Sequence, residues 1–281
     1  MTAGPELFDR RCSVTVDTLE LHGFDVSFTI TKTLKPEPNT CELEVYNLSE
    51  DHITQLQQLQ DESKQATRGI ACRIEAGYAD DVSLVWLGDL RTASTVYDSP
   101  GWVTRLSSGD GEKGWKNARE HVSYGPRTPL ETALRAMVRA MGWGEGNLSK
   151  YVAKLKHAGI ADFPHGVVIS GSQSRELRDF ARSAGLEFSV QDGALQLLEN
   201  GMALDEEAIV LSSSTGLVGS PSVDSDGVLT CDTLMIPGVR PGRLVVMEAG
   251  RDRGNYRIVR AVCKGDTAGD DWGYSIEAKR Y

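Results

Sequence analysis

Apolar and polar residues alternate with a period of two over most of the first hundred residues. The alternating apolar positions are Val14, Val16, Leu19, Leu21, Phe24, Val26, Phe28, Ile30, Cys41, Leu43, Val45, Ile70, Cys72, Ile74 and Ala76. Successive side chains of a strand point to opposite faces, so this period is typical of an antiparallel sheet with one buried face and one solvated face. A helix would scatter the same residues around its circumference. Residues 10–110 are therefore predicted to be mostly β structure.

One helix interrupts this region. Ser49 is a good N-cap, acidic residues follow it in the first turn, and the apolar spacing becomes helical at Ile53, Leu56 and Leu59. Two further strands are predicted over residues 84–96 and 102–106, with a turn at residues 99–101 between them.

Residues 111–200 have a mixed pattern. Thr128, Pro129 and Glu131 suit an N-cap, a first helical residue and the third position of a capping box, and a helical apolar stripe comes directly after them. A second helix is expected over about 174–184. A hairpin with a central Asp-Gly turn is expected over residues 186–197.

The last part of the chain returns to strands. They are predicted at Ile209–Leu211, Val228–Ile236, Gly242–Glu248, Tyr256–Cys263 and Trp272–Ala278. The pattern thus predicts a mainly β fold with an α/β insertion, divided into residues 1–110, 111–205 and 206–281.

Charge and cysteine usage narrow the class of protein. The chain has 40 acidic and 30 basic residues, a net charge of −10, which disfavours a nucleic-acid-binding surface as its main feature, because neutralising phosphates needs a basic face. Residues 1–108 hold the acidic surplus. The five cysteines (Cys12, Cys41, Cys72, Cys231 and Cys263) are dispersed, which indicates buried thiols in a reducing compartment. No secretory signal or membrane-spanning run is recognisable, so we expect a soluble protein made in a cytoplasm.

A glycine-rich segment, residues 109–114, matches the GxGxxG pattern of dinucleotide sites. That site needs a parallel βαβ unit and an acidic residue about 20 positions on. The flanking strands have an antiparallel pattern, and Glu131 falls in a helix start. We therefore expect a glycine-rich exit from the first β region.

Other candidate chemical sites are equally weak. Ser170-Gly171-Ser172 lacks the GxSxG frame of a nucleophile elbow, and the histidines (His22, His52, His121, His157 and His165) have no obvious partner acid in sequence. Ser172 or Ser174 is instead expected to be an N-cap. Residues 224–227 lack the acids of a calcium loop, and residues 266–271 suit a solvated acidic loop. We predict no catalytic, cofactor-binding or metal residue, no cofactor and no enzymatic activity.

The clean alternation predicts sheets whose edges need covering. Open edges invite aggregation unless another chain covers them, so such a protein can use its edges to assemble into a ring or tube. A monomer with two self-closed barrels is the alternative from the pattern alone.

Several segments resemble tailed-phage baseplate hub proteins. In the first β region they are Phe28–Lys32 and Pro36–Ser49, where a strand, a Pro/Asn turn and a second strand lead into a helix cap. Near the end of the chain they are Thr215–Pro221, Leu234–Arg243, Gly254–Ile258, Gly265–Thr267 and Trp272. The middle helix and the hairpin at 188–197 suit the inserted domain of the same family. The resemblance extends over nearly the whole chain and rests on the order of these short motifs.

The resemblance implies two tube-like antiparallel β-barrel units flanking a small mixed domain. It also implies a homotrimer that joins a sixfold tail tube to a threefold spike and lines the channel for DNA. The implied partners are the tail tube protein, a spike or tail-tip protein and the tape measure protein, with DNA only in passage and no membrane binding. The place is the virion tail baseplate, after synthesis in the bacterial host cytoplasm. The chain is short for the family, so no spike or lysozyme activity is implied.

Two other functions stay open at this stage. One is a receptor- or carbohydrate-binding β module, and the other is a small hydrolase of the tail tip. The first needs an exposed aromatic platform, although only 7% of residues are aromatic. The second needs a pocket that pairs a nucleophile with a base. For the hub itself, we expect acidic residues along the channel, since they would not hold passing DNA.

Overall fold

The computed structural model describes residues 9–65, 69–79 and 81–281, which divide into two compact units. The first, here called the sheet unit, comprises the described parts of residues 1–33, 39–109 and 202–281. The second, the inserted unit, comprises residues 34–38 and 110–201. The β regions at the two ends of the sequence therefore belong to one unit.

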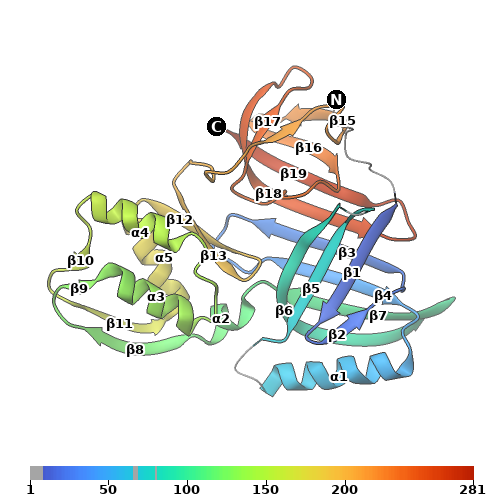
Figure 1. The fold of residues 1–281 in the computed structure, drawn as a ribbon, viewed down its shortest axis with the longest axis horizontal. Coiled ribbons are helices and arrows are strands. Elements are labelled where there is room, and N and C mark those ends of the chain that lie inside the picture. Colours follow the sequence, from blue (N-terminus) through green and yellow to red (C-terminus); the bar gives the residue numbers. More distant parts are fainter. Residues whose placement is uncertain (1–8, 66–68, 80) are drawn as a thin grey trace. The chain divides into compact units, whose positions relative to one another are not determined.

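The sheet unit is built mainly from antiparallel strands (Figure 1). Its earlier strands are β1 (Arg10–Val16), β2 (Leu19–Leu21), β3 (Val26–Thr33), β4 (Thr40–Tyr46), β5 (Ala71–Tyr78), β6 (Asp81–Asp98) and β7 (Gly101–Gly109). Its later strands are β14 (Ile209–Leu211), β15 (Leu217–Val223), β16 (Val228–Leu234), β17 (Leu244–Met247), β18 (Gly254–Asp266) and β19 (Trp272–Arg280). The predicted mainly β fold with an antiparallel sheet is confirmed.

All thirteen strands form a single sheet, because β3 pairs with β18. The two partners lie more than 200 residues apart in sequence, and their ladder runs from Ser27 opposite Asp266 to Thr33 opposite Arg260. Within the described residues the strand path is open and closes no barrel. One apolar core extends through both regions, from Val14 to Ala278.

The predicted helix of the first β region is present as α1 (Glu50–Gln65). Ser49 caps it, since its Oγ accepts a hydrogen bond from the His52 N–H at 3.3 Å. Leu56 is fully buried in the core of the sheet unit, whereas most of the helix surface is polar. The helix therefore docks by a narrow apolar stripe.

The two β regions have the same strand order. Neighbours run β3-β4-β7-β6-β5-β1 in residues 9–109, the first module, and β15-β16-β19-β18-β17-β14 in residues 209–281, the second module. Helix α1 connects β4 to β5, and the loop 235–243 connects β16 to β17. One difference lies at the end of the series: β1 is antiparallel to β5, whereas β14 is parallel to β17.

A β-bulge repeats at the same place in both modules. The register of β6 on β7 shifts between Leu90 and Thr92, and that of β18 on β19 shifts between Ile258 and Arg260. A bulge bends a strand and increases its twist. Before its bulge, β6 pairs with β5 and β18 pairs with β17. After the bulge, neither strand keeps that partner on the same edge.

The inserted unit has its own apolar core, which shares no residue with the core of the sheet unit. Its helices are α2 (Glu112–Asn117), α3 (Leu130–Ala140), α4 (Leu148–His157) and α5 (Gln173–Ser183). Its strands are β8 (Arg119–Tyr124), β9 (Thr128–Pro129), β10 (Asp162–Phe163), β11 (Val167–Ser172), β12 (Leu186–Gln191) and β13 (Ala194–Glu199). The predicted hairpin is β12–β13.

Two local expectations for this unit were wrong or incomplete. Thr128 does not cap α3: it belongs to β9, faces Phe163 in β10, and its hydroxyl donates to the Gly125 carbonyl at 2.8 Å. The strand pair thus holds the residue that would otherwise cap the helix. Helix α4 was not predicted, and the Asn147 side chain before it bonds to the backbone of Leu197. No helix in the described residues combines the length and apolarity needed to cross a membrane.

Candidate functional site

The glycine-rich segment packs the inserted unit and lacks a dinucleotide-site geometry. The strand before it, β7, is antiparallel to both neighbours, and α2 has only six residues. A Cβ on Gly111 or Gly114 would lie 2.5 Å from the Trp143 indole nitrogen, so glycine is needed for this close packing. Between these glycines and β7, the buried Asp110 carboxylate accepts hydrogen bonds from the N–H groups of Asp192 and Gly193, at 2.9 and 2.7 Å.

The serine segment makes one contact of chemical interest. Ser170 Oγ lies 2.8 Å from His121 Nδ1, where β11 faces β8. Both side chains are exposed, and no carboxylate in the described part of the chain is seen to bond His121. A nucleophile of this kind needs an oriented base and an oxyanion site. Ser172 takes the N-cap position of α5, but its hydroxyl bonds Ser174 Oγ and caps no N–H group.

The acidic turns are held by their own backbone. Asp224 Oδ1 accepts from the N–H groups of Asp226 and Val228, and Asp266 Oδ1 from those of Ala268 and Gly269. These are turn geometries, as predicted. Across the described residues no group of three or more His, Cys, Asp or Glu side chains could hold a metal ion.

The cysteines are free thiols in the core of the sheet unit. Cys41, Cys72, Cys231 and Cys263 are buried, and Cys12 is partly buried. Burial raises the pKa of Cys72 and of Cys263 to about 12 and that of Cys231 to about 11. Such thiols are protonated at neutral pH and are therefore poor nucleophiles.

One face of the sheet is polar and crosses both modules. It consists of the residues that alternate with the core positions in β16, β19, β18, β3, β4, β7 and the last part of β6. Cross-strand ion pairs lie along it, such as Arg105 with Glu44 at 2.8 Å and Arg260 with Glu277 at 2.6 Å. Its acidic residues are Glu42, Glu44, Asp98, Asp232, Asp266 and Glu277, and its basic residues are Arg105, Arg260, Lys264 and Lys279.

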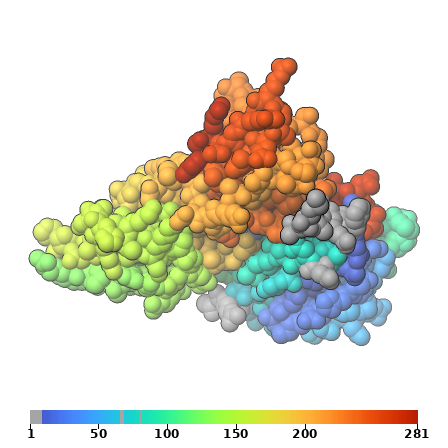
Figure 2. Space-filling model, turned by 45° about the horizontal axis from the view of Figure 1, so that its top comes forward, coloured from blue at the N-terminus to red at the C-terminus, as the bar shows by residue number. Residues whose placement is uncertain are grey.

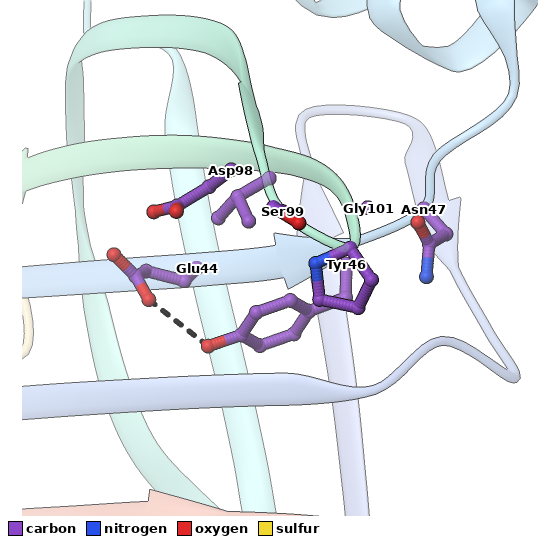
Figure 3. A pocket seen from close by; sticks show the side chains of 8 residues that line it. Glu44, Tyr46, Asn47, Asp98, Ser99 and Gly101 are labelled. Atoms are coloured by element: carbon purple, nitrogen blue, oxygen red, sulfur yellow. Dashed lines mark hydrogen bonds between the residues drawn. The ribbon is translucent and has the colours of Figure 1, made fainter.

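A shallow pocket of about 260 Å³ lies on this face at the β6–β7 turn (Figure 3). In it, Tyr46 Oη donates to Glu44 Oε2 at 3.0 Å, and partial burial together with this bond raises the pKa of Tyr46. A second pocket of about 410 Å³ includes Asp232, the residue equivalent to Glu44, and the end of the β18–β19 loop. The two modules therefore repeat a surface hollow as well as a strand order.

The turn between β6 and β7 exposes aromatic side chains. Tyr97 is 61% exposed and Trp102 is 52% exposed, and their rings meet edge to face with centroids 5.4 Å apart. Figure 2 shows part of this hairpin, in teal, at the surface. Exposed apolar clusters of this kind mark interaction surfaces. Sequence patterning missed this cluster, because alternation alone does not tell which side chains of a strand end stay uncovered.

Comparison with known proteins identifies the family. The model of the family described as "Baseplate hub gp41" matches residues 11–250. The chain belongs to the baseplate hub gp41 family. The resemblance seen in the sequence is thereby confirmed, and a tail component of a virion is the class of protein that this family represents. No curated protein matches the chain.

Solved structures of tail proteins share the fold of this hub protein. A tail protein from Neisseria meningitidis MC58 is 11% identical, with a TM-score of 0.62 and 97% of each chain covered. The 43 kDa tail protein of prophage MuSo2 from Shewanella oneidensis is 13% identical, with a TM-score of 0.62 and coverage of 97% and 98%. The E. coli c3393 protein, a type VI secretion component described as similar to T4 tail proteins gp27 and gp5, is 9% identical with a TM-score of 0.58; 95% of this chain and 76% of that chain are covered.

Proposed function

We propose that this protein is the structural hub of a phage or phage-like tail, a homotrimer that joins a sixfold tail tube to a threefold spike. The repeated strand order carries the proposal. Three copies of a chain with two similar modules present six similar modules, and this number can satisfy a sixfold ring on one side and a threefold partner on the other. Family membership supports the tail location.

In this proposal the two predicted tube-like barrel units, residues 1–110 and 206–281, are not closed within one chain. Each is a sheet segment that completes a barrel only when copies assemble. The open strand path agrees with this, because a sheet with free ends leaves hydrogen-bonding edges for a neighbour. The part between them, residues 111–205, lies outside the tube and helps to pack the subunits.

The polar face is the part of the sheet that suits a channel wall. It is hydrated, crosses both modules without interruption, and has six acidic against four basic side chains, several of them paired. A slightly acidic wall does not bind DNA, so DNA can slide past it during ejection into the host. Function then resides in interfaces with the tube, spike and tape measure proteins, without catalysis, cofactor or membrane binding.

Light scattering after size-exclusion chromatography, followed by electron microscopy of the protein with its tail tube protein, tests the proposal. We expect a trimer, alone or on addition of the tube protein, and a pseudo-sixfold ring in projection. A protein that remains monomeric with both the tube and the spike protein present would contradict it. The protein is expected to accumulate in the cytoplasm of the producing bacterium, before assembly.

A further inference from the structure

Within this chain, the two modules contact each other around a tryptophan of the second module. Trp272, at the start of β19 in the second module, is only 6% exposed. Two aromatic rings of the first module meet it edge to face: Phe28 of β3, with centroids 6.1 Å apart, and Tyr78 of β5, at 6.5 Å. The guanidinium of Arg10 lies over the same ring at 5.5 Å from its centroid. The first module thus covers an aromatic side chain of the second.

The first module has a tryptophan at the equivalent position, and this tryptophan is half exposed. After the bulges, Ser108 faces Leu90 as Ala278 faces Ile258, which makes these residues equivalent. Six residues before each lies a tryptophan, Trp102 in β7 and Trp272 in β19. One position is therefore buried by a neighbouring module in one half of the chain and half exposed in the other.

The strand edge beside each tryptophan differs in the same way. Beyond its bulge, β18 pairs with β3. The equivalent part of β6 has β7 as its only strand partner in the described residues, so its other edge has no strand on it. Helix α1 closes the start of that edge, where Gln60 Oε1 accepts from the Ala93 N–H at 3.1 Å and Ser63 Oγ donates to the Leu90 carbonyl at 2.9 Å.

The second module carries the element that corresponds to β3. This element is β15, the last strand of the sheet path, and Ser222 pairs with Thr230 as Thr29 pairs with Glu42. By this register, Val223 corresponds to Ile30, whose partner on β18 is Cys263. The equivalent of Cys263 on β6 is Thr95.

The lengths of these elements also fit. Strand β15 ends at Val223, so on this register it would cover β6 from Thr95 toward Asp98. The Gln60 contact closes the edge at Ala93, just before that point. Pro221 lacks an N–H group, so β15 offers fewer ladder bonds than β3 does, and burial of the aromatic side chains must supply much of the contact energy.

A basic loop lies beside β15. The loop after β17 contains two exposed basic residues, Arg251 and Arg253, and a Cβ on Gly250 would lie 3.6 Å from Pro221, so the loop and β15 are neighbours. Counted from Ile74 and Met247, which face the equivalent residues Trp86 and Gly254, Arg251 stands at the position of Tyr78. A guanidinium over an indole ring is a favourable contact.

We propose that the β6–β7 tip, with Tyr97, Trp102 and the open edge of β6 from Thr95, binds β15 and the β17–β18 loop of a second copy of this chain. The contact repeats, between chains, the one that β3 and Trp272 make within a chain. Its two sides are different surfaces, so copies add head to tail and close a ring when the rotation permits. The inference deepens the proposed function, since it assigns the residues that hold the trimer.

The first test is the oligomeric state of Trp102→Glu against the unaltered protein and a matched control, Val82→Glu. Val82 is 38% exposed near the start of β6, at the other end of that strand from the β6–β7 tip, and is not part of this surface. We expect Trp102→Glu to raise the dissociation constant of the assembly at least about tenfold relative to the parent, because a central tryptophan often dominates the binding energy of an interface. Circular dichroism and thermal unfolding establish that both variants are folded. A Trp102→Glu variant that assembles as the parent does would overturn the inference.

The second test is disulfide cross-linking between two single variants, Thr95→Cys and Val223→Cys. Facing residues on antiparallel strands have Cα atoms about 4.5–5.5 Å apart, within the reach of a disulfide. We expect the mixture to form a covalent dimer under mild oxidation, and either variant alone to form none. Cross-links within a single variant would indicate a symmetric contact and contradict the head-to-tail arrangement.

The outcomes separate this inference from the proposed function. A trimer that forms no Thr95–Val223 cross-link and tolerates Trp102→Glu leaves the hub proposal standing and removes this interface. A strictly monomeric protein, even with its tube and spike partners, removes both.

Discussion

At the scale of single residues, buried polar groups fix the geometry of the turns. Asp110 is fully buried, and its carboxylate accepts two N–H groups from the Asp192–Gly193 turn of the β12–β13 hairpin. Charged hydrogen bonds of this kind are stronger than neutral ones, and an unmade bond to a buried group costs free energy. The sequence did not indicate this role, because Asp110 stood out there only as part of a GxGxxG match.

Asp110→Ala is expected to lower the free energy of unfolding of the inserted unit by about 2–4 kcal/mol, because two N–H groups lose their acceptor. Urea denaturation followed by fluorescence measures the change. Asp179→Ala, which removes an exposed carboxylate on α5, is the control and should stay within about 0.5 kcal/mol of the parent. Equal effects of the two substitutions would show that the buried bonds contribute nothing specific.

The thiols give a residue-scale prediction that depends on pH. A thiol whose pKa is raised to about 12, as for Cys72, is ionised to only about one part in 10⁴ at pH 8. Native protein should therefore react with Ellman's reagent at least about tenfold more slowly than protein in guanidinium, where all five thiols are available. The unfolded thiols ionise near pH 9 while the native ones stay protonated, so stability should fall as the pH rises from 9 toward 12. Rapid native labelling at pH 8 would contradict the burial.

At the scale of elements, the repeated bulge explains how one long strand serves two partners. In both modules buried residues stand three positions apart, at Leu90 and Ala93 and at Ile258 and Ala261, instead of two. This break in the alternation is a local signal that the sequence contains. Beyond the break, helix α1 closes the start of the β6 edge, whereas strand β3 of the first module pairs with the β18 edge. Contacts with distant segments decide this difference.

Leu56→Ala is expected to destabilise the sheet unit by about 2–5 kcal/mol, the range for truncating a fully buried leucine. Helix α1 has few other apolar contacts, so its docking depends strongly on this side chain. Gln57→Ala, one residue along on the exposed side, is the matched control for chemical denaturation. A loss below about 1 kcal/mol for Leu56→Ala would show that α1 docks in another way.

At the scale of the whole molecule, two separate cores predict two unfolding transitions. The core of the sheet unit and that of the inserted unit share no residue. In calorimetry, Leu56→Ala should shift one transition and Asp110→Ala the other. A single transition that both substitutions shift equally would mean that the two units unfold together.

Alternation and turn chemistry are properties of neighbouring residues, so the sequence predicted most strands of the sheet unit with their inward and outward faces, helix α1 and the β12–β13 hairpin. It did not predict β15, β8, β9 or β10. The family was also recognisable from the order of short motifs. Helix α4 and the role of Thr128 were missed, since the contacts that fix them come from segments 50 and 35 residues away in the sequence.

The neighbours of each strand, in contrast, depend on contacts between distant parts of the chain. Every backbone offers the same N–H and C=O groups, so nothing local in β3 marks β18 as its partner. The same holds for the two tryptophans: Trp102 and Trp272 stand at equivalent strand positions, and their surroundings differ because one meets a neighbouring module inside the chain. Pairing over such distances depends on the summed burial of whole faces, which the local pattern does not contain.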